Sequence, residues 1–240
     1  MLRLILISFL FIFSVQTYGR TFKNAYISFE MLDNWKCQLE QTEWVCRAED
    51  PQESKEAVII LTAKEKGPTD TFELYQNHMS SPITTQGNSG SMTSTVIYKT
   101  TQLKMSDHPW LDALHTNSEV QNYYTRYLAT TKDQIAILVT FSAHNKYYAK
   151  HSTNFNSTVK SLRVIASKDI LSRPDLGPFR GSGEQLGDSI GRAMPSDLLA
   201  PENESSSQGR GYLKNPMVVG SIILLLAAIA FIVLRFRKKN

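Results

Sequence analysis

Cysteine is scarce in this sequence, which holds two cysteines among its 240 residues. Two thiols cannot build the dense disulfide framework of a small secreted scaffold. The five histidines form no His-Glu-x-x-His or comparable metal-ligand motif. The sequence also lacks a Gly-x-Ser-x-Gly elbow and a Walker loop. We therefore expect no metal site, no cofactor and no enzymatic activity.

The central part of the chain also lacks a charge excess, although the whole chain carries a net charge of +4. Residues 20–165 contain fifteen basic and fifteen acidic side chains. The excess lies beside the hydrophobic runs at the two chain ends, in Arg3 and in the segment 235–239. Because a basic patch favours nucleic-acid binding only on a folded face, we expect no nucleic-acid partner.

Residues 1–19 have the pattern of a secretory signal peptide. Arg3 precedes an apolar core, Leu4–Val15, and Thr17 and Gly19 place small residues at the −3 and −1 positions of a cleavage site. As a helix the core would be about 18 Å long, which is short of the ~30 Å hydrocarbon core of a bilayer. We predict a cleaved signal peptide, and an uncleaved anchor is the alternative.

The second hydrophobic run, Met217–Leu234, has eighteen residues without a charge, or about 27 Å of helix. Pro216 precedes it and the basic segment 235–240 follows. Because basic flanks stay in the cytoplasm, we predict a single-pass transmembrane helix at 216–234 with a cytoplasmic tail at 235–240. The rest of the chain would then lie outside the inner or plasma membrane. A buried core helix is the alternative, but nothing would cover it at a chain end.

The two cysteines, Cys37 and Cys46, lie in short strand-like segments joined by a turn near Gln41-Thr42. A turn of two or four residues would place them directly opposite each other, with the close Cα atoms that a disulfide requires. An even cysteine count in an exported chain favours oxidation. A two-cysteine metal or redox site is the alternative, but the spacing is not that of a Cys-x-x-Cys motif. We predict a structural disulfide.

Hydrophobic periodicity predicts an α+β domain over residues 20–165. Besides the cysteine hairpin, we expect strands at residues 25–31, 57–61, 95–105, 110–115, 120–130 and 134–141. A short helix would start near Asp70 and Glu73, which resemble a capping box, and a second would cover residues 145–162. We predict a loop at 81–94. Consecutive strands joined by short turns pair antiparallel, so the fold would be a mainly antiparallel sheet covered by two helices, an α/β/α sandwich.

A family resemblance accompanies this pattern. The opening Tyr26-Ile27-Ser28-Phe29, the following Asn34-Trp35 and the closing Phe155–Leu162 resemble the PsbP/DcrB-like group of small exported domains. The resemblance covers about residues 23–165. It implies a PsbP-like fold and a non-catalytic accessory or assembly role. The cysteine hairpin and the carboxy-terminal hydrophobic helix depart from the group's pattern.

Aromatic residues supply the candidate interaction face, namely Trp110, Tyr123, Tyr124 and Tyr127. Tyr and Trp are enriched at interfaces because they combine an apolar body with a polar tip. The tyrosines of the predicted strand 120–130 point to both of its faces, so one face would be core and the other accessible. The alternative is that all four belong to the core edge and the sheet surface.

The densest group of polar residues with catalytic potential is Asp107, His108, Asp112 and His115. An enzyme would have to bring these side chains together in a deep cleft. Asp107-His108-Pro109, however, is ordinary turn composition.

Residues 166–215 have the composition of a flexible stalk, with nineteen Gly, Ser or Pro in fifty positions. Within the stalk, Leu186, Ile190 and Met194 would form an apolar stripe if the segment became helical. The stripe could then dock on a partner. A plain linker is the alternative.

We therefore expect a membrane-tethered, non-catalytic binding or accessory module of the cell envelope, with an envelope protein as its partner. A carbohydrate or cell-wall binder that uses the exposed aromatic residues is the alternative, and an enzyme is a further one.

Overall fold

The structure is a computed structural model that describes residues 20–87, 90–173, 179–187 and 194–198. The predicted signal peptide, transmembrane helix and cytoplasmic tail lie outside the described residues. Within these ranges, no helix combines the length and the apolar character that crossing a membrane requires.

The described elements are β1 (Arg20–Lys23), β2 (Ile27–Met31), β3 (Trp35–Glu40), β4 (Glu43–Ala48), η1 (Glu53–Lys55), β5 (Ala57–Glu65), α2 (Phe72–Met79), β6 (Thr84–Gly87), β7 (Gly90–Thr93), β8 (Thr95–Met105), β9 (His108–Thr116), β10 (Tyr123–Lys132), β11 (Ile135–His144), α3 (Tyr148–Ser161), β12 (Arg163–Val164) and η2 (Ile170–Ser172). Seven strands form an antiparallel sheet in the order β3-β4-β5-β11-β10-β9-β8. A smaller sheet contains β1, β2 and β12, and β6 pairs with β7. The predicted mainly antiparallel sheet is confirmed, whereas the predicted loop 81–94 contains the β6–β7 hairpin.

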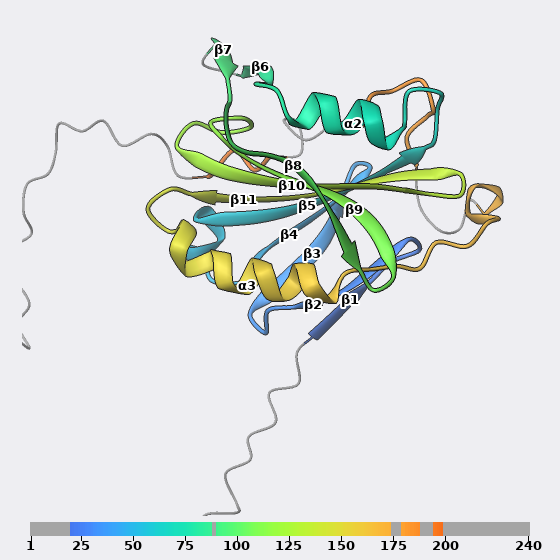
Figure 1. Cartoon of the computed structure of the whole chain (residues 1–240). Helices are drawn as coiled ribbons and strands as arrows, with labels where there is room; N and C mark the ends of the chain where they lie inside the picture. Colours follow the sequence, from blue (N-terminus) through green and yellow to red (C-terminus); the bar gives the residue numbers. More distant parts are fainter. Residues whose placement is uncertain (1–19, 88–89, 174–178, 188–193, 199–240) are drawn as a thin grey trace, which may run out of the picture. The chain divides into compact units, whose positions relative to one another are not determined.

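The two helices lie on opposite sides of the seven-stranded sheet (Figure 1). Phe155 and Val159 of α3 belong to one apolar cluster, and Met79 of α2 belongs to the other. The sheet is therefore the middle layer between two helical layers, as predicted.

β5 explains why one segment of the sequence is a continuous apolar run. Ile59 and Leu61 point into the α3-side cluster, whereas Val58 and Ile60 point into the α2-side cluster. Successive side chains of a strand face opposite sides, so a strand covered on both faces needs apolar residues at every position. Each such side chain contributes about 1.5–3 kcal/mol by burial.

The start of α2 differs from the predicted capping box. Thr71 is the N-cap residue, and its hydroxyl accepts a hydrogen bond from the Leu74 N–H at 3.2 Å. Asp70 is buried instead, and it forms an ion pair with the fully buried Lys64. A buried ammonium group requires a charged partner, so Asp70 serves the core and the neighbouring threonine caps the helix.

The folded part continues past Ile165, the predicted last residue of the domain. The Ile165 N–H donates to the Tyr26 carbonyl at 3.0 Å. Ile170 is 1% exposed and belongs to the α3-side cluster. The predicted boundary at residue 165 is therefore too early, because apolar side chains beyond it complete the core.

Residues 179–187 also contact the domain. β5 extends beyond Glu43, the first residue of β4, so part of the β5 edge is left free by that strand. Arg180 occupies this edge by forming a parallel bridge with Lys64. The Glu65 N–H donates to the Arg180 carbonyl at 2.8 Å. The Arg180 side chain donates to Glu43 of β4 at 2.8 Å. This part of the predicted stalk is thus attached to the central sheet.

Candidate functional site

The predicted aromatic interaction face does not form as expected. Trp110 and Tyr123 are 0% exposed and Tyr127 is 3% exposed, so only Tyr124 reaches the surface. The prediction was wrong for the three buried side chains because the sheet is covered on both faces. The side chains of β10 alternate between two faces of the sheet, and neither face is open to solvent along the whole strand.

The buried tyrosines use their hydroxyl groups to bind loops. Tyr123 donates to the Lys55 carbonyl at 2.7 Å. Tyr127 contacts Ser118 at 2.8 Å and Glu119 at 2.6 Å. A buried Tyr requires such a partner, so both residues have a structural role.

A different aromatic group is accessible, and we call it the tyrosine patch: Tyr98 of β8, Tyr124 of β10 and Tyr148 of α3. All three side chains are half-buried. The rings of Tyr124 and Tyr148 pack against each other with their centroids 4.8 Å apart. The patch thus joins three elements that are distant in the sequence.

A rigid ion pair lies within the tyrosine patch. Arg126 donates to Asp112 through Nε at 2.7 Å and through Nη2 at 2.9 Å, in a two-pronged arrangement. The Tyr98 hydroxyl also donates to Asp112, at 3.2 Å. Arg126 Nη1 donates to Asn156 of α3 at 2.7 Å. Two-pronged Arg–carboxylate bonds are strong and geometrically specific, so they fix the patch in one arrangement.

The electrostatics keep Tyr98, Tyr148 and Arg126 each in one protonation state. Burial and the Asp112 carboxylate raise the pKa of Tyr98, and burial raises the pKa of Tyr148. Burial lowers the pKa of Arg126, but the bonds to Asp112 outweigh it and the net pKa is raised. Both hydroxyls therefore stay protonated and the guanidinium stays charged near neutral pH.

The four polar residues with catalytic potential are bonded to separate partners. Asp107 has a 95% exposed side chain and pairs with Lys104, while Asp112 binds Arg126 within the patch. His108 contacts Thr130 Oγ1 at 2.8 Å. The structure therefore gives each of these residues its own contacts and does not unite them in one constellation.

His115, the fourth of these residues, is fully buried between Ser94 and α2. Its Nε2 lies 2.8 Å from the Met79 carbonyl and its Nδ1 lies 3.0 Å from the Ser94 hydroxyl. Because burial lowers the pKa of His115, the ring is neutral, so Nε2 donates to the carbonyl and Nδ1 accepts from Ser94. Ser94 is 3% exposed and also accepts from the Ile83 N–H. The bond from His115 to Met79 therefore anchors α2 to β9. The Ser94 hydroxyl is buried in these contacts and is not open to a substrate.

One group in the described ranges has donor atoms close enough to hold a metal ion: Glu53, Glu56 and His151. The Lys150 ammonium lies 3.1 Å from Glu53 and 2.7 Å from Glu56. It already forms ion pairs with both carboxylates that a cation would need as ligands. We therefore assign this group to the attachment of α3 to the segment around η1.

The predicted docking stripe is only partly within the described residues, since Ile190 lies outside them. Residues 181–187 form turns, and Gly187 has a φ of 106°, which a right-handed helix does not allow. Leu186 and Met194 pack against the α2-side cluster of the domain itself. These two side chains cover the chain's own core in this structure.

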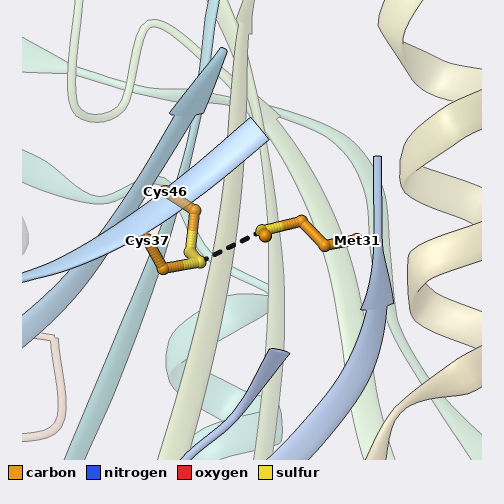
Figure 2. The surroundings of a disulfide bond; sticks show 3 residues. All are labelled: Met31, Cys37 and Cys46. Atoms are coloured by element: carbon orange, nitrogen blue, oxygen red, sulfur yellow. Dashed lines mark hydrogen bonds between the residues drawn. A yellow bond between two sulfur atoms is a disulfide. The ribbon is translucent and has the colours of Figure 1, made fainter. Parts of the chain in front are cut away.

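The predicted disulfide is present between Cys37 and Cys46, which are directly opposite each other in the β3–β4 hairpin. The turn has two residues, Gln41 and Thr42, between the paired Glu40 and Glu43. Figure 2 shows the disulfide between the two strands, with Met31 of β2 directed at it. The Met31 sulfur lies 3.3 Å from Cys37 Sγ. The bridge therefore sits on the α3 side of the edge hairpin.

Comparisons with known proteins identify solved structures of similar fold. No family model and no curated protein matches the sequence. The PsbP protein of the cyanobacterium Synechocystis is 11% identical, with a TM-score of 0.47, over 63% of this chain and 95% of that one. The yeast Ran-binding protein Mog1p is 10% identical, with a TM-score of 0.37, over 62% and 97%. LpqN of Mycobacterium tuberculosis, which is involved in cell envelope biogenesis, is 7% identical, with a TM-score of 0.33, over 62% and 87%.

PsbP is thus among the solved structures that this chain resembles, as the sequence predicted. At these identities the likeness concerns the fold alone, and we take no binding residue or partner from it.

Proposed function

We propose that this protein is a non-catalytic binding or assembly module of the cell envelope, tethered to the membrane by residues 216–234 and displayed on its outer side. The tyrosine patch binds the partner, and the partner is an envelope protein. The tether and the orientation rest on the two hydrophobic end segments and their basic flanks.

The arrangement of Tyr98, Tyr124 and Tyr148 around the Asp112–Arg126 pair carries this proposal. Rigid aromatic side chains lose little conformational entropy on binding, and a partner can contact both their rings and their hydroxyl groups. The internal ion pair fixes the patch before a partner arrives, which lowers the ordering cost of association.

Site-specific photo-crosslinking in native membranes tests the proposal. A photoreactive phenylalanine at Tyr124 should capture one protein reproducibly. The same probe at Leu74 is the matched control, because Leu74 is 47% exposed but belongs to α2, on the opposite side of the sheet. The Tyr148→Ala exchange should weaken capture at Tyr124, and a cooperative melting transition of the variant shows that the domain remains folded.

Equal capture of the same protein at Tyr124 and Leu74 would contradict a specific patch. Retention of cell-wall polymer without a captured protein would support the carbohydrate-binding alternative instead.

A further inference from the structure

β3 is one edge of the seven-stranded sheet, and three of its six side chains are exposed to solvent. Lys36, Gln38 and Leu39 are exposed, and Leu39 is 45% exposed despite being apolar. An exposed regular edge strand presents unpaired backbone groups that favour pairing with another strand.

The hairpin determines which backbone groups of β3 face this edge. Glu40 and Glu43 flank the two-residue turn and form its closing hydrogen-bonded pair, so hydrogen-bonded and non-hydrogen-bonded pairs alternate from there. Cys37 and Cys46 form a non-hydrogen-bonded pair, consistent with their Cα separation of 3.9 Å. The N–H and C=O groups of Cys37 and Leu39 therefore point away from β4, toward the edge.

The charges of β3 are poorly matched within its own hairpin. Lys36 lies directly opposite Arg47, and Glu40 lies directly opposite Glu43. Like charges in this position are destabilising. Arg47 forms an ion pair with Glu40 at 2.8 Å, but Lys36 has no ion pair within the part of the chain that the structure describes.

We propose that a second copy of this chain pairs with β3, antiparallel and centred on Gln38. Cys37 of each copy then lies opposite Leu39 of the other, and their outward N–H and C=O groups form four backbone hydrogen bonds. Lys36 of each copy lies opposite Glu40 of the other, so both ion pairs form at once by symmetry. The neighbouring registers, centred on residue 37 or 39, keep the hydrogen bonds but place Lys36 opposite an uncharged residue.

The opposite edge of the sheet, β8, is protected against such pairing. Its register with β9 is irregular between Val96 and Tyr98 and again between Tyr98 and Thr101. The Thr100 N–H donates to Ser80 Oγ at 3.3 Å. Bulges and covered backbone groups block edge-to-edge association. β3 has a regular register with β4 throughout, and the disulfide holds it in place.

Charge reversal tests this dimer in the full chain by analytical ultracentrifugation in mild detergent at micromolar concentration. Lys36→Glu and Glu40→Lys each replace two attractive contacts by two repulsive ones. Each should therefore weaken dimerisation about tenfold or more. The double variant K36E/E40K restores the opposite charges and should dimerise like the original chain. An equimolar mixture of the two single variants should form heterodimers for the same reason.

Two controls separate dimerisation from folding. Lys36→Glu places a carboxylate opposite Arg47, so this variant should melt at the original temperature or above. Lys99→Glu reverses an exposed charge on β8 and should leave dimerisation unchanged. A chain that is monomeric throughout the concentration range would overturn the proposal. A dimer that Lys36→Glu does not weaken, or single variants that do not associate when mixed, would also overturn it.

Discussion

Arg180 and Glu43 form a nearly buried ion pair, with 2.8 Å between Arg180 Nε and Glu43 Oε1 across a sequence separation of 137 residues. The side chain of Glu43 is only 3% exposed. This contact attaches a segment with the composition of a linker to the edge hairpin of the sheet. The folded domain consequently depends on residues well beyond position 165.

Arg180→Ala tests this dependence. Removal of one partner leaves a buried carboxylate without its countercharge, which costs about 3–5 kcal/mol in the free energy of unfolding. Urea denaturation of the variant and the original chain measures the loss. Arg20→Ala is the matched control: its ion pair with Glu49 is half-exposed, so its removal should have little effect. Equal, small effects of both exchanges would contradict the proposed attachment.

The buried Lys64–Asp70 pair predicts a second, pH-dependent effect. Burial raises the pKa of Asp70, but the bonds from Lys64, Tyr75 and Gly67 outweigh it and lower the pKa below its ordinary value of 3.8. A lowered carboxyl pKa contributes stability that is complete above the unfolded value. This stability is lost as the pH falls through the folded value.

Asp70→Asn should therefore destabilise the chain by about 3–5 kcal/mol at neutral pH, because Lys64 remains buried without a countercharge. The difference between the variant and the original chain should shrink at acid pH, once Asp70 is protonated in both states of the original chain. Urea titrations at a series of pH values measure this difference. A difference that stays constant with pH would exclude the ion pair as its source. Asp107→Asn, in an exposed pair, is the control.

The disulfide predicts a moderate stability effect. Closing a loop with a sequence separation of 9 residues stabilises the fold by about 2–3 kcal/mol in the chain-entropy treatment. The double exchange C37A/C46A and reduction of the original chain should lower the free energy of unfolding by similar amounts. Non-reducing mass spectrometry should find the two cysteines joined, and free thiols after rapid alkylation would refute the pairing.

Sequence reasoning succeeded where the pattern was local. The apolar run of β5 identified a strand covered on both faces. The spacing of Cys37 and Cys46 around a possible two-residue turn predicted their pairing. Both features depend on residues close together in the sequence.

Sequence reasoning failed where distant segments meet. Tyr123 and Tyr127 alternate with Tyr124, but their burial depends on the helices and loops that cover each face. Asp is a residue type that often caps helices, so the sequence predicted a cap at Asp70. Asp70 instead pairs with the buried ammonium group of Lys64, a contact that the sequence pattern does not indicate. The tyrosine patch depends on Asp112 and Arg126, which become neighbours only through the pairing of β9 with β10.

The proposed membrane tether depends on the topology, which reporter fusions measure directly. A reporter that is active only outside the cytoplasm should be active when fused after Pro201 and silent when fused after Asn240. This result would place the domain outside, with residues 216–234 crossing the membrane once. Activity at Asn240, or silence at Pro201 with the reporter expressed and intact, would contradict a tethered envelope module.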